Sequence, residues 1–176
     1  DVTKEEDWAS AVDQAVARAG FSKPTLYQHF RSKDELIQAG LELRDRRHRE
    51  RLTRLWEEPE RSAADRLLAA FEVLEGWLSE RPDFRGCAFT NAAVELNGSQ
   101  HPGRIVVRQH KRWLREYMEE CAEEIGSPDP AGLAAALLYL LEGAMVMAHI
   151  EGDRSAGALA RRGALTLIAA HSSSGV

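Results

Sequence analysis

Cysteine is scarce in this 176-residue chain, and the two that occur, Cys87 and Cys121, lie far apart. They form no paired-cysteine motif, so neither a disulfide framework nor a zinc site is expected. Such cysteine usage is typical of the reducing cytoplasm, and no signal peptide is visible. We therefore expect a cytoplasmic protein.

Catalytic patterns are also missing. The six histidines are scattered, without a His-x-x-x-His or Glu-x-x-His pair at metal-ligand spacing. The sequence has no phosphate-binding glycine loop, no Gly-x-Ser-x-Gly turn and no Cys-x-x-Cys pair. Cys87 beside Gly86 could be a reactive thiolate at a helix start, but a buried, inert cysteine is the simpler interpretation. We therefore expect no catalytic residue, no metal and no cofactor, and we do not predict an enzyme.

A general excess of basic residues is missing too, because 23 lysines and arginines stand against 28 aspartates and glutamates, giving a net charge of −5. The basic residues nevertheless gather in the first third of the chain, whereas the rest is rich in glutamate. The gathered residues are Arg18, Lys23, Arg31, Lys33, Arg44, Arg46, Arg47, Arg49, Arg51 and Arg54. This distribution indicates a protein that presents one end to a nucleic acid, although most of these charges could merely solvate helix surfaces.

Apolar residues recur with the helical period through most of the chain, and proline and glycine separate the periodic segments. Leu67, Phe71, Leu74 and Leu78, for example, form one stripe. We predict helices over residues 32–56, 62–80, 86–96, 104–125, 133–150 and 155–171, which makes the fold class all-α. His48, in the first of these helices, is interpreted as a packing or surface residue.

The segment over residues 133–150 is the most apolar and approaches the length of a membrane span. Glu142 falls in its middle, where a charge in lipid is expensive, and several alanines keep its hydropathy moderate. We therefore expect a helix buried in protein and no membrane partner.

Residues 10–36 have the pattern of a helix, a tight turn, a short second helix and the start of a third. Gly20 is placed to end the first helix, Ser22 to cap the second, and Pro24 is tolerated in its first turn. Ser32 and Glu35 have the spacing of a capping box for the third. This is the helix-turn-helix shape, whose second helix enters the DNA major groove, although an ordinary helical corner has the same spacing.

The second helix of this motif carries side chains suited to DNA. Its hydroxyl and imidazole groups can donate to phosphates, and Gln28 can address a base edge. Lys33 lies at a helix N-terminus, where free amides also favour phosphate. The predicted DNA-binding residues are Ser22, Lys23, Pro24, Thr25, Tyr27, Gln28, His29 and Lys33.

The run from Ala19 to Leu36, AGFSKPTLYQHFRSKDEL, resembles the DNA-binding signature of the TetR family of transcriptional regulators. The family pattern is a glycine, a hydrophobic residue and a serine, followed by Thr-Leu-Tyr, His-Phe and Ser-Lys-Glu/Asp before a leucine. Residues 84–91 and 142–144 also resemble family members, so the likeness covers most of the chain.

The resemblance implies an all-α homodimer that binds double-stranded operator DNA and releases it when a small-molecule effector enters a second domain. Residues 1–45 would then form a helix-turn-helix head, and residues 46–176 the ligand-binding and dimerisation body. The family has a complete helix before Ser10, which the short, polar residues 1–7 do not supply. Because the sequence also lacks an initiator methionine, we expect that N-terminal residues are missing from it.

Aromatic side chains are more numerous in the body than helix seams need, and polar groups stand among them. Ligand pockets are typically apolar and aromatic with a few polar groups, although aromatics also fill cores. The predicted ligand-binding residues are Phe71, Trp77, Phe89, Asn91, His110, Trp113, Tyr117, Tyr139 and Glu142.

Small residues on the last two predicted helices permit close helix approach. In the TetR family these two helices form a four-helix dimer interface, although such stripes can also pack within one subunit. The predicted dimer residues are Ala144, Ala148, Leu159, Gly163, Ala164 and Leu167. A two-fold dimer would place its recognition helices about 34–36 Å apart on a roughly palindromic operator.

We therefore predict a ligand-responsive transcriptional regulator that acts as a repressor. A small apolar or aromatic effector would bind in the body and shift the helix over residues 32–56, which changes the spacing of the two heads. One alternative is a small-molecule-binding helical protein without regulatory DNA binding. A DNA-binding protein that responds to no ligand is another.

Overall fold

Six α-helices account for most of residues 29–172, which are the residues that the computed structural model describes. No β-strand occurs in this part of the chain, so the all-α prediction is confirmed. The helices are α3 (Lys33–Trp56), α4 (Ala63–Glu80), α5 (Ala88–Glu95), α6 (Pro102–Glu124), α7 (Pro130–Glu151) and α8 (Ala156–His171). Each bound lies within three residues of the predicted one.

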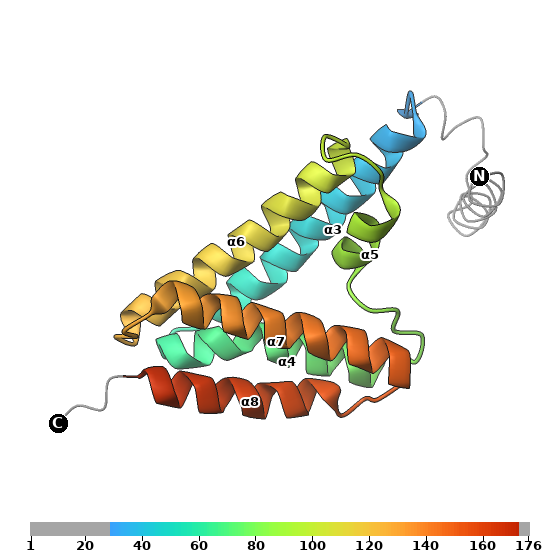
Figure 1. The fold of residues 1–176 in the computed structure, drawn as a ribbon. Helices are drawn as coiled ribbons and strands as arrows, with labels where there is room; N and C mark the ends of the chain where they lie inside the picture. Colours follow the sequence, from blue (N-terminus) through green and yellow to red (C-terminus); the bar gives the residue numbers. More distant parts are fainter. Residues whose placement is uncertain (1–28, 173–176) are drawn as a thin grey trace.

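The two longest helices, α3 and α6, run side by side in the same direction and form an arm of the molecule (Figure 1). Contacts occur in the same order along both helices: Asp34 lies 3.2 Å from His101 at the start, and the rings of Trp56 and Tyr117 stack near the end. The other long helices, α4, α7 and α8, pack into a layer below this arm, and the short α5 lies beside it (Figure 1).

Side-chain caps fix where α3 and α4 begin. Ser62 Oγ accepts a hydrogen bond from the Asp65 amide, and the Asp65 carboxylate accepts one from the Ser62 amide. Together these two bonds form a complete capping box. Ser32 likewise accepts from the Glu35 amide at 3.1 Å. The return bond predicted for Glu35 is wrong in detail, because its carboxylate accepts from the Arg31 amide at 2.6 Å, one residue earlier than in a capping box.

The main hydrophobic core lies between α4, α6, α7 and α8, with the end of α3. The stripe predicted for α4 faces this core, and all four of its members are buried: Leu67, Phe71, Leu74 and Leu78. Burial of such side chains stabilises the fold by about 1.5–3 kcal/mol each. This core therefore provides a rigid base against which α3 and α6 are held.

A second, smaller core lies near the start of α3. Leu41, Phe89, Val106 and Val107 are its buried members, and they join α3, α5 and α6. Gly103 permits this close approach, because a Cβ atom there would lie 2.7 Å from Leu96 Cδ1 and 3.2 Å from Leu41 Cδ1. The start of α3 is thus packed directly on α6.

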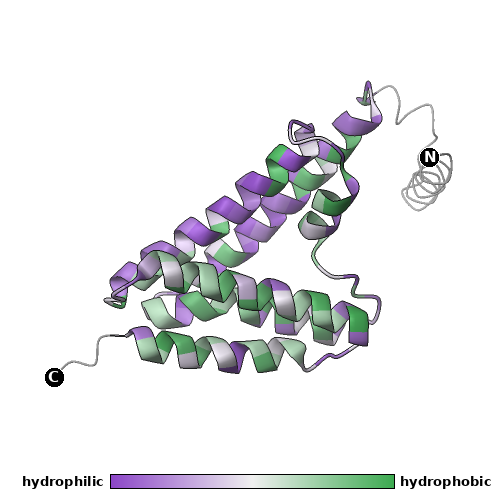
Figure 2. Ribbon diagram, in the orientation of Figure 1, coloured by the Kyte–Doolittle hydropathy of each residue, from purple (hydrophilic) through white to green (hydrophobic). Residues whose placement is uncertain are grey.

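Among the described helices, α7 alone is long and apolar enough to cross a membrane, with a mean hydropathy of 1.8. Figure 2 shows this hydrophobic helix within the layer below the more hydrophilic arm. One face of α7 packs into the main core through Leu133, Leu137 and Leu141. Glu142, the acidic residue in the middle of this helix, forms an ion pair with Lys111 of α6. The helix therefore has the packing expected of a core helix.

Candidate functional site

His110 is the one buried polar residue in the described part of the chain, with an exposed fraction of 2%. It lies midway along α6, where its Nδ1 is 2.7 Å from Asp45 Oδ1 of α3. Phe89 of α5 stacks on its ring with 3.7 Å between centroids. Burial lowers the pKa of His110 to about 4, although the Asp45 hydrogen bond acts in the opposite direction. The ring is therefore neutral at pH 7 and donates Nδ1–H to the carboxylate.

His48 of α3 lies beside it, with the two imidazole centroids 5.1 Å apart, and the Trp77 ring lies 5.4 Å from that of His48. Burial, together with neighbouring His110 and Lys111, lowers its pKa to about 3. A second neutral imidazole thus adjoins the first. His48 is a packing residue, as predicted, but its packing site is the wall of a cavity.

This cavity has a volume of about 860 Å³ and is bounded by α3, α4, the segment 81–87, α5, α6 and α7. Pockets of about 300–1,000 Å³ hold drug-sized ligands. Five of the predicted ligand-binding residues line it together: Trp77, Phe89, Asn91, His110 and Glu142. Phe84, Leu114, Leu141 and Met145 add apolar surface. The cavity can therefore accept an organic molecule against the middle of α3.

Glu142 is held in a fixed position at this cavity. Its carboxylate accepts a hydrogen bond from Thr90 Oγ1 at 2.7 Å and forms an ion pair with Lys111. The Lys111 ammonium also donates to Cys87 Sγ at 3.3 Å. Asn91 points its amide at the backbone, with Nδ2 donating to the Arg85 carbonyl at 2.9 Å. These contacts tie α5, α6 and α7 together around one wall.

The other predicted ligand-binding residues lie elsewhere. Phe71 is fully buried in the main core. Trp113 and Tyr117 pack around Trp56, Tyr117 stacking on it at 3.2 Å between centroids. Tyr139 points outward from α7 and is 71% exposed. A binding role for these four stays a prediction, and none of them lines the cavity.

Several cavity-lining residues were not predicted, and they are basic: Arg44, Arg47, Arg51, Arg81, Arg85 and Lys111. The sequence interpretation assigned the arginines of residues 44–51 to a basic DNA-binding end, but three of them face the cavity. The spacing of these residues could have indicated that they share one face of the helix. Residues 44, 47, 48 and 51 recur at i, i+3, i+4 and i+7, which places them on one face of α3.

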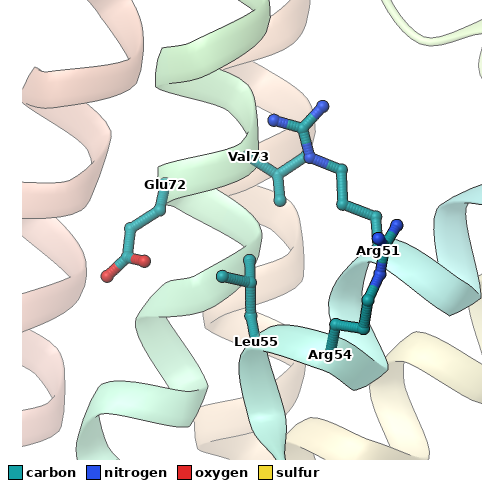
Figure 3. A pocket seen from close by; sticks show the side chains of 5 residues that line it. All are labelled: Arg51, Arg54, Leu55, Glu72 and Val73. Carbon is teal, nitrogen blue, oxygen red and sulfur yellow. The ribbon is translucent and has the colours of Figure 1, made fainter. Parts of the chain in front are cut away.

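A second hollow of about 400 Å³ lies between α3 and α4, and Arg51 lines both it and the cavity. Figure 3 shows the carboxylate of Glu72 pointing away from the guanidinium groups of Arg51 and Arg54. Glu72 instead pairs with Arg61 at 2.7 Å and lies 3.8 Å from Arg161. With only five lining residues and less than half the volume of the cavity, this hollow is the weaker ligand site.

The predicted DNA-binding residues fall mainly outside the described residues. These are Ser22, Lys23, Pro24, Thr25, Tyr27 and Gln28. The remaining two, His29 and Lys33, are exposed. Lys33 is the first residue of α3, directly after the Ser32 cap. The positive end of the helix dipole at such a position favours phosphate.

The predicted dimer residues divide between the subunit interior and its surface. Ala144, Ala148 and Ala164 are buried within the subunit, whereas Leu159 is 57% exposed. A Cβ atom at Gly163 would lie 3.2 Å from Leu140 Cδ2 of α7, and Leu167 packs at the edge of the main core. The exposed apolar side chains of α7 and α8 are Tyr139, Val146, Met147, Ile150, Leu159 and Leu165. These, more than the alanines, are what a partner molecule would meet.

Comparison with known proteins identifies both parts of the chain. Residues 5–39 match the model of the tetR family of bacterial regulatory proteins, and residues 63–164 match the tetracyclin repressor-like C-terminal domain. The chain belongs to the TetR family. Its members regulate transcription by binding DNA and are not enzymes. The TetR prediction made from residues 19–36 is therefore confirmed.

Solved TetR structures resemble this TetR-family chain over most of its length. A candidate TetR transcriptional regulator from Streptomyces avermitilis is 34% identical, with a TM-score of 0.77 over 91% of this chain and 86% of that one. SCO4454, a TetR-family transcriptional regulator from Streptomyces coelicolor, is 28% identical, with a TM-score of 0.82 over 92% and 84%. E. coli NemR in its reduced form shares the fold at 23% identity, with a TM-score of 0.73 over 85% and 81%. The comparison with curated proteins gave no significant match.

Proposed function

We propose that this TetR-family protein is a cytoplasmic, homodimeric repressor that a small molecule releases from its operator. Residues 22–29 and Lys33 bind palindromic double-stranded DNA, and the effector binds in the cavity of about 860 Å³. The observation that carries this proposal is the position of the cavity. The middle of α3 forms part of the cavity wall, and α3 begins at the end of the family's DNA-binding signature.

A ligand in this cavity can act on α3 because α3 is tied to α6 at three levels. Asp34 faces His101 at the start, Asp45 bonds His110 in the middle, and Trp56 stacks on Tyr117 at the end. Packed helices shift as rigid bodies rather than bend gradually. A ligand that moves α3 relative to α6 therefore reorients the head attached to α3, and a coupling of about 1–3 kcal/mol gives a measurable response.

The proposed dimer uses the outer faces of α7 and α8. Their exposed apolar side chains, which include Tyr139 and Ile150, occur on two helices that pack side by side (Figure 1). Large apolar patches on a soluble protein mark interaction sites. A two-fold interface uses the same patch on both subunits, so these helices would form a four-helix contact.

Selection of binding sites from random duplex DNA by the full-length protein tests this function. We expect a roughly palindromic consensus with half-site centres one helical turn apart. Enrichment of no sequence, with only weak binding that ignores sequence, would contradict a role as an operator-specific regulator. It would instead favour a helical ligand-binding protein without regulatory DNA binding.

A further inference from the structure

The cavity wall carries a charge that the chain as a whole does not have. Six of its lining residues are cationic and two are acidic, although the protein has a net charge of −5. Arg44, Arg47 and Arg51 come from one face of α3, Arg81 and Arg85 from the segment before α5, and Lys111 from α6. Cations from three parts of the sequence therefore converge on one space, and a cleft of one charge sign concentrates the electric field.

The acidic residues of the wall do not cancel these cations. Glu142 already forms an ion pair with Lys111, which leaves Asp83 as the one lining carboxylate to balance five arginines. Within residues 29–172, Arg44, Arg47, Arg51 and Arg85 form no ion pair with a carboxylate. Elsewhere in the described residues, Arg49, Arg61, Arg66 and Arg161 do pair with carboxylates. The carboxylates of the cavity wall therefore balance its positive charge only in part.

The deeper wall is apolar and uncharged. Phe84, Phe89, Leu114 and Leu141 line it, together with the rings of Trp77, His48 and His110. The His110 Nδ1 is already engaged by Asp45, and Phe89 stacks on the His110 ring. A molecule that fits here must have an apolar or aromatic body for the deep wall and a group that satisfies several guanidinium groups near the surface.

We infer that the ligand of this cavity is an organic anion, with a carboxylate attached to an aromatic or apolar body. Guanidinium groups match carboxylates with paired, charge-assisted hydrogen bonds. The volume of about 860 Å³ suits an anion of drug-like size. This inference rests on the proposed function, because it specifies the chemical class of the proposed effector. The sequence predicted an apolar or aromatic effector, and the inference adds that this molecule has a negatively charged group.

Three naphthalene probes of nearly the same shape test the charge preference: 2-naphthoate, its neutral amide 2-naphthamide, and the cation 2-naphthylmethylammonium. Calorimetric titration of the full-length protein should show that 2-naphthoate binds at least about tenfold more tightly than the other two. Its affinity should fall as salt rises, whereas that of the amide should not. Equal or tighter binding of the amide or the cation would overturn the inference. So would the absence of saturable binding of 2-naphthoate at millimolar concentration.

Arginine variants test whether the preference for an anionic ligand arises from the cavity wall. Arg47→Gln and Arg85→Gln should each weaken 2-naphthoate binding by about fivefold to tenfold, and leave naphthamide binding unchanged. Arg112→Gln is the matched control, because Arg112 is an exposed arginine of α6 that does not line the cavity. If the cavity variants kept full 2-naphthoate affinity but lost affinity for DNA, these arginines would serve the nucleic acid, and the inference would fail.

Operator binding separates this inference from the proposed function. If 2-naphthoate binds through the arginines but operator affinity does not change, the anion site stands and the effector role fails. If operator binding is specific but the neutral probe binds as well as the anion, the regulator stands and the anionic class fails.

Discussion

Asp45 and His110 lie 65 residues apart in the sequence, yet Asp45 Oδ1 and His110 Nδ1 are 2.7 Å apart. This hydrogen bond joins the two parallel helices of the arm midway along their length, at the wall of the cavity. Asp45 also accepts from Arg49 Nε at 2.8 Å, one turn further along α3. The carboxylate is thus held from both sides, and it fixes the position of a buried imidazole.

Loss of the Asp45 carboxylate should destabilise the protein. In Asp45→Ala the buried His110 Nδ1–H has no acceptor, and such an orphaned group costs about 1–3 kcal/mol. Asp45→Asn keeps an acceptor oxygen and should cost less than half as much. Urea unfolding of both variants at pH 7 measures the difference. If Asp45→Ala unfolds at the same urea concentration as the unsubstituted protein, this bond does not hold α3 to α6.

Mild acid should weaken the fold through the half-buried His48 and the buried His110. Their pKa values are lowered to about 3 for His48 and about 4 for His110, against 6.5 for a free histidine. Between about pH 6.5 and pH 4 the unfolded chain therefore binds protons that the folded protein does not. Each histidine then lowers the free energy of unfolding by up to about 1.4 kcal/mol per pH unit as the pH falls. Stability contributed by these neutral rings is fully present only above pH 6.5.

Urea unfolding between pH 7 and pH 5 checks this pH dependence. His48→Gln should flatten it, because one of the two protonation sites is removed. His149→Gln is the control, because His149 is exposed and lies outside the cavity. A pH slope that is the same in all three proteins would show that His48 and His110 do not titrate as described.

The contact between the starts of α3 and α6 should be sensitive to one added methyl group. In Gly103→Ala the new Cβ would lie 2.7 Å from Leu96 Cδ1 and 3.2 Å from both Ile37 and Leu41. We expect a net loss of about 1–2 kcal/mol, because overpacking outweighs the better helix propensity of alanine. Gly40→Ala, with nothing within 4 Å of its Cβ, should instead gain up to about 1 kcal/mol. A stabilised Gly103→Ala protein would show that this junction is loosely packed.

A charge on the outer face of α7 should dissociate the proposed dimer. Ile150 is 70% exposed on that face, and Ile150→Glu would bury a carboxylate against its two-fold mate. We expect monomers by analytical ultracentrifugation, with the helical content retained. Val94→Glu is the matched control, because Val94 is 81% exposed on α5 and lies outside α7 and α8. Dissociation by the Val94 change, or none by the Ile150 change, would place the interface elsewhere.

Much of the fold follows from short-range signals in the sequence. The stripe Leu67, Phe71, Leu74 and Leu78 is buried as predicted, since a 3.6-residue period directly indicates the inner face of a helix. The start of α4 at Ser62 could be predicted because the cap is a contact between residues only three apart in the sequence. Such features need no knowledge of what lies across the helix.

Prediction of the cavity wall would have needed information that the sequence does not contain. The face of α3 with Arg44, Arg47 and Arg51 looks like a solvated face, because a helix surface that borders a hollow has the same residue types as one that borders water. The alanines predicted for the dimer show the reverse problem. Ala144 and Ala164 permit close packing, but the sequence could not indicate whether the neighbour would be another helix of the same subunit.

Fluorescence anisotropy of a labelled operator duplex, titrated with the full-length protein at several salt concentrations, tests the central claim most directly. We predict two protomers per duplex, a strong preference over scrambled DNA, and an affinity that falls steeply with salt. Lys33→Ala should reduce the salt slope by about one, Tyr27→Phe should weaken binding to all sequences alike, and Gln28→Ala should relax base preference. A single bound protomer, or an affinity that depends on neither salt nor these three residues, would contradict the account.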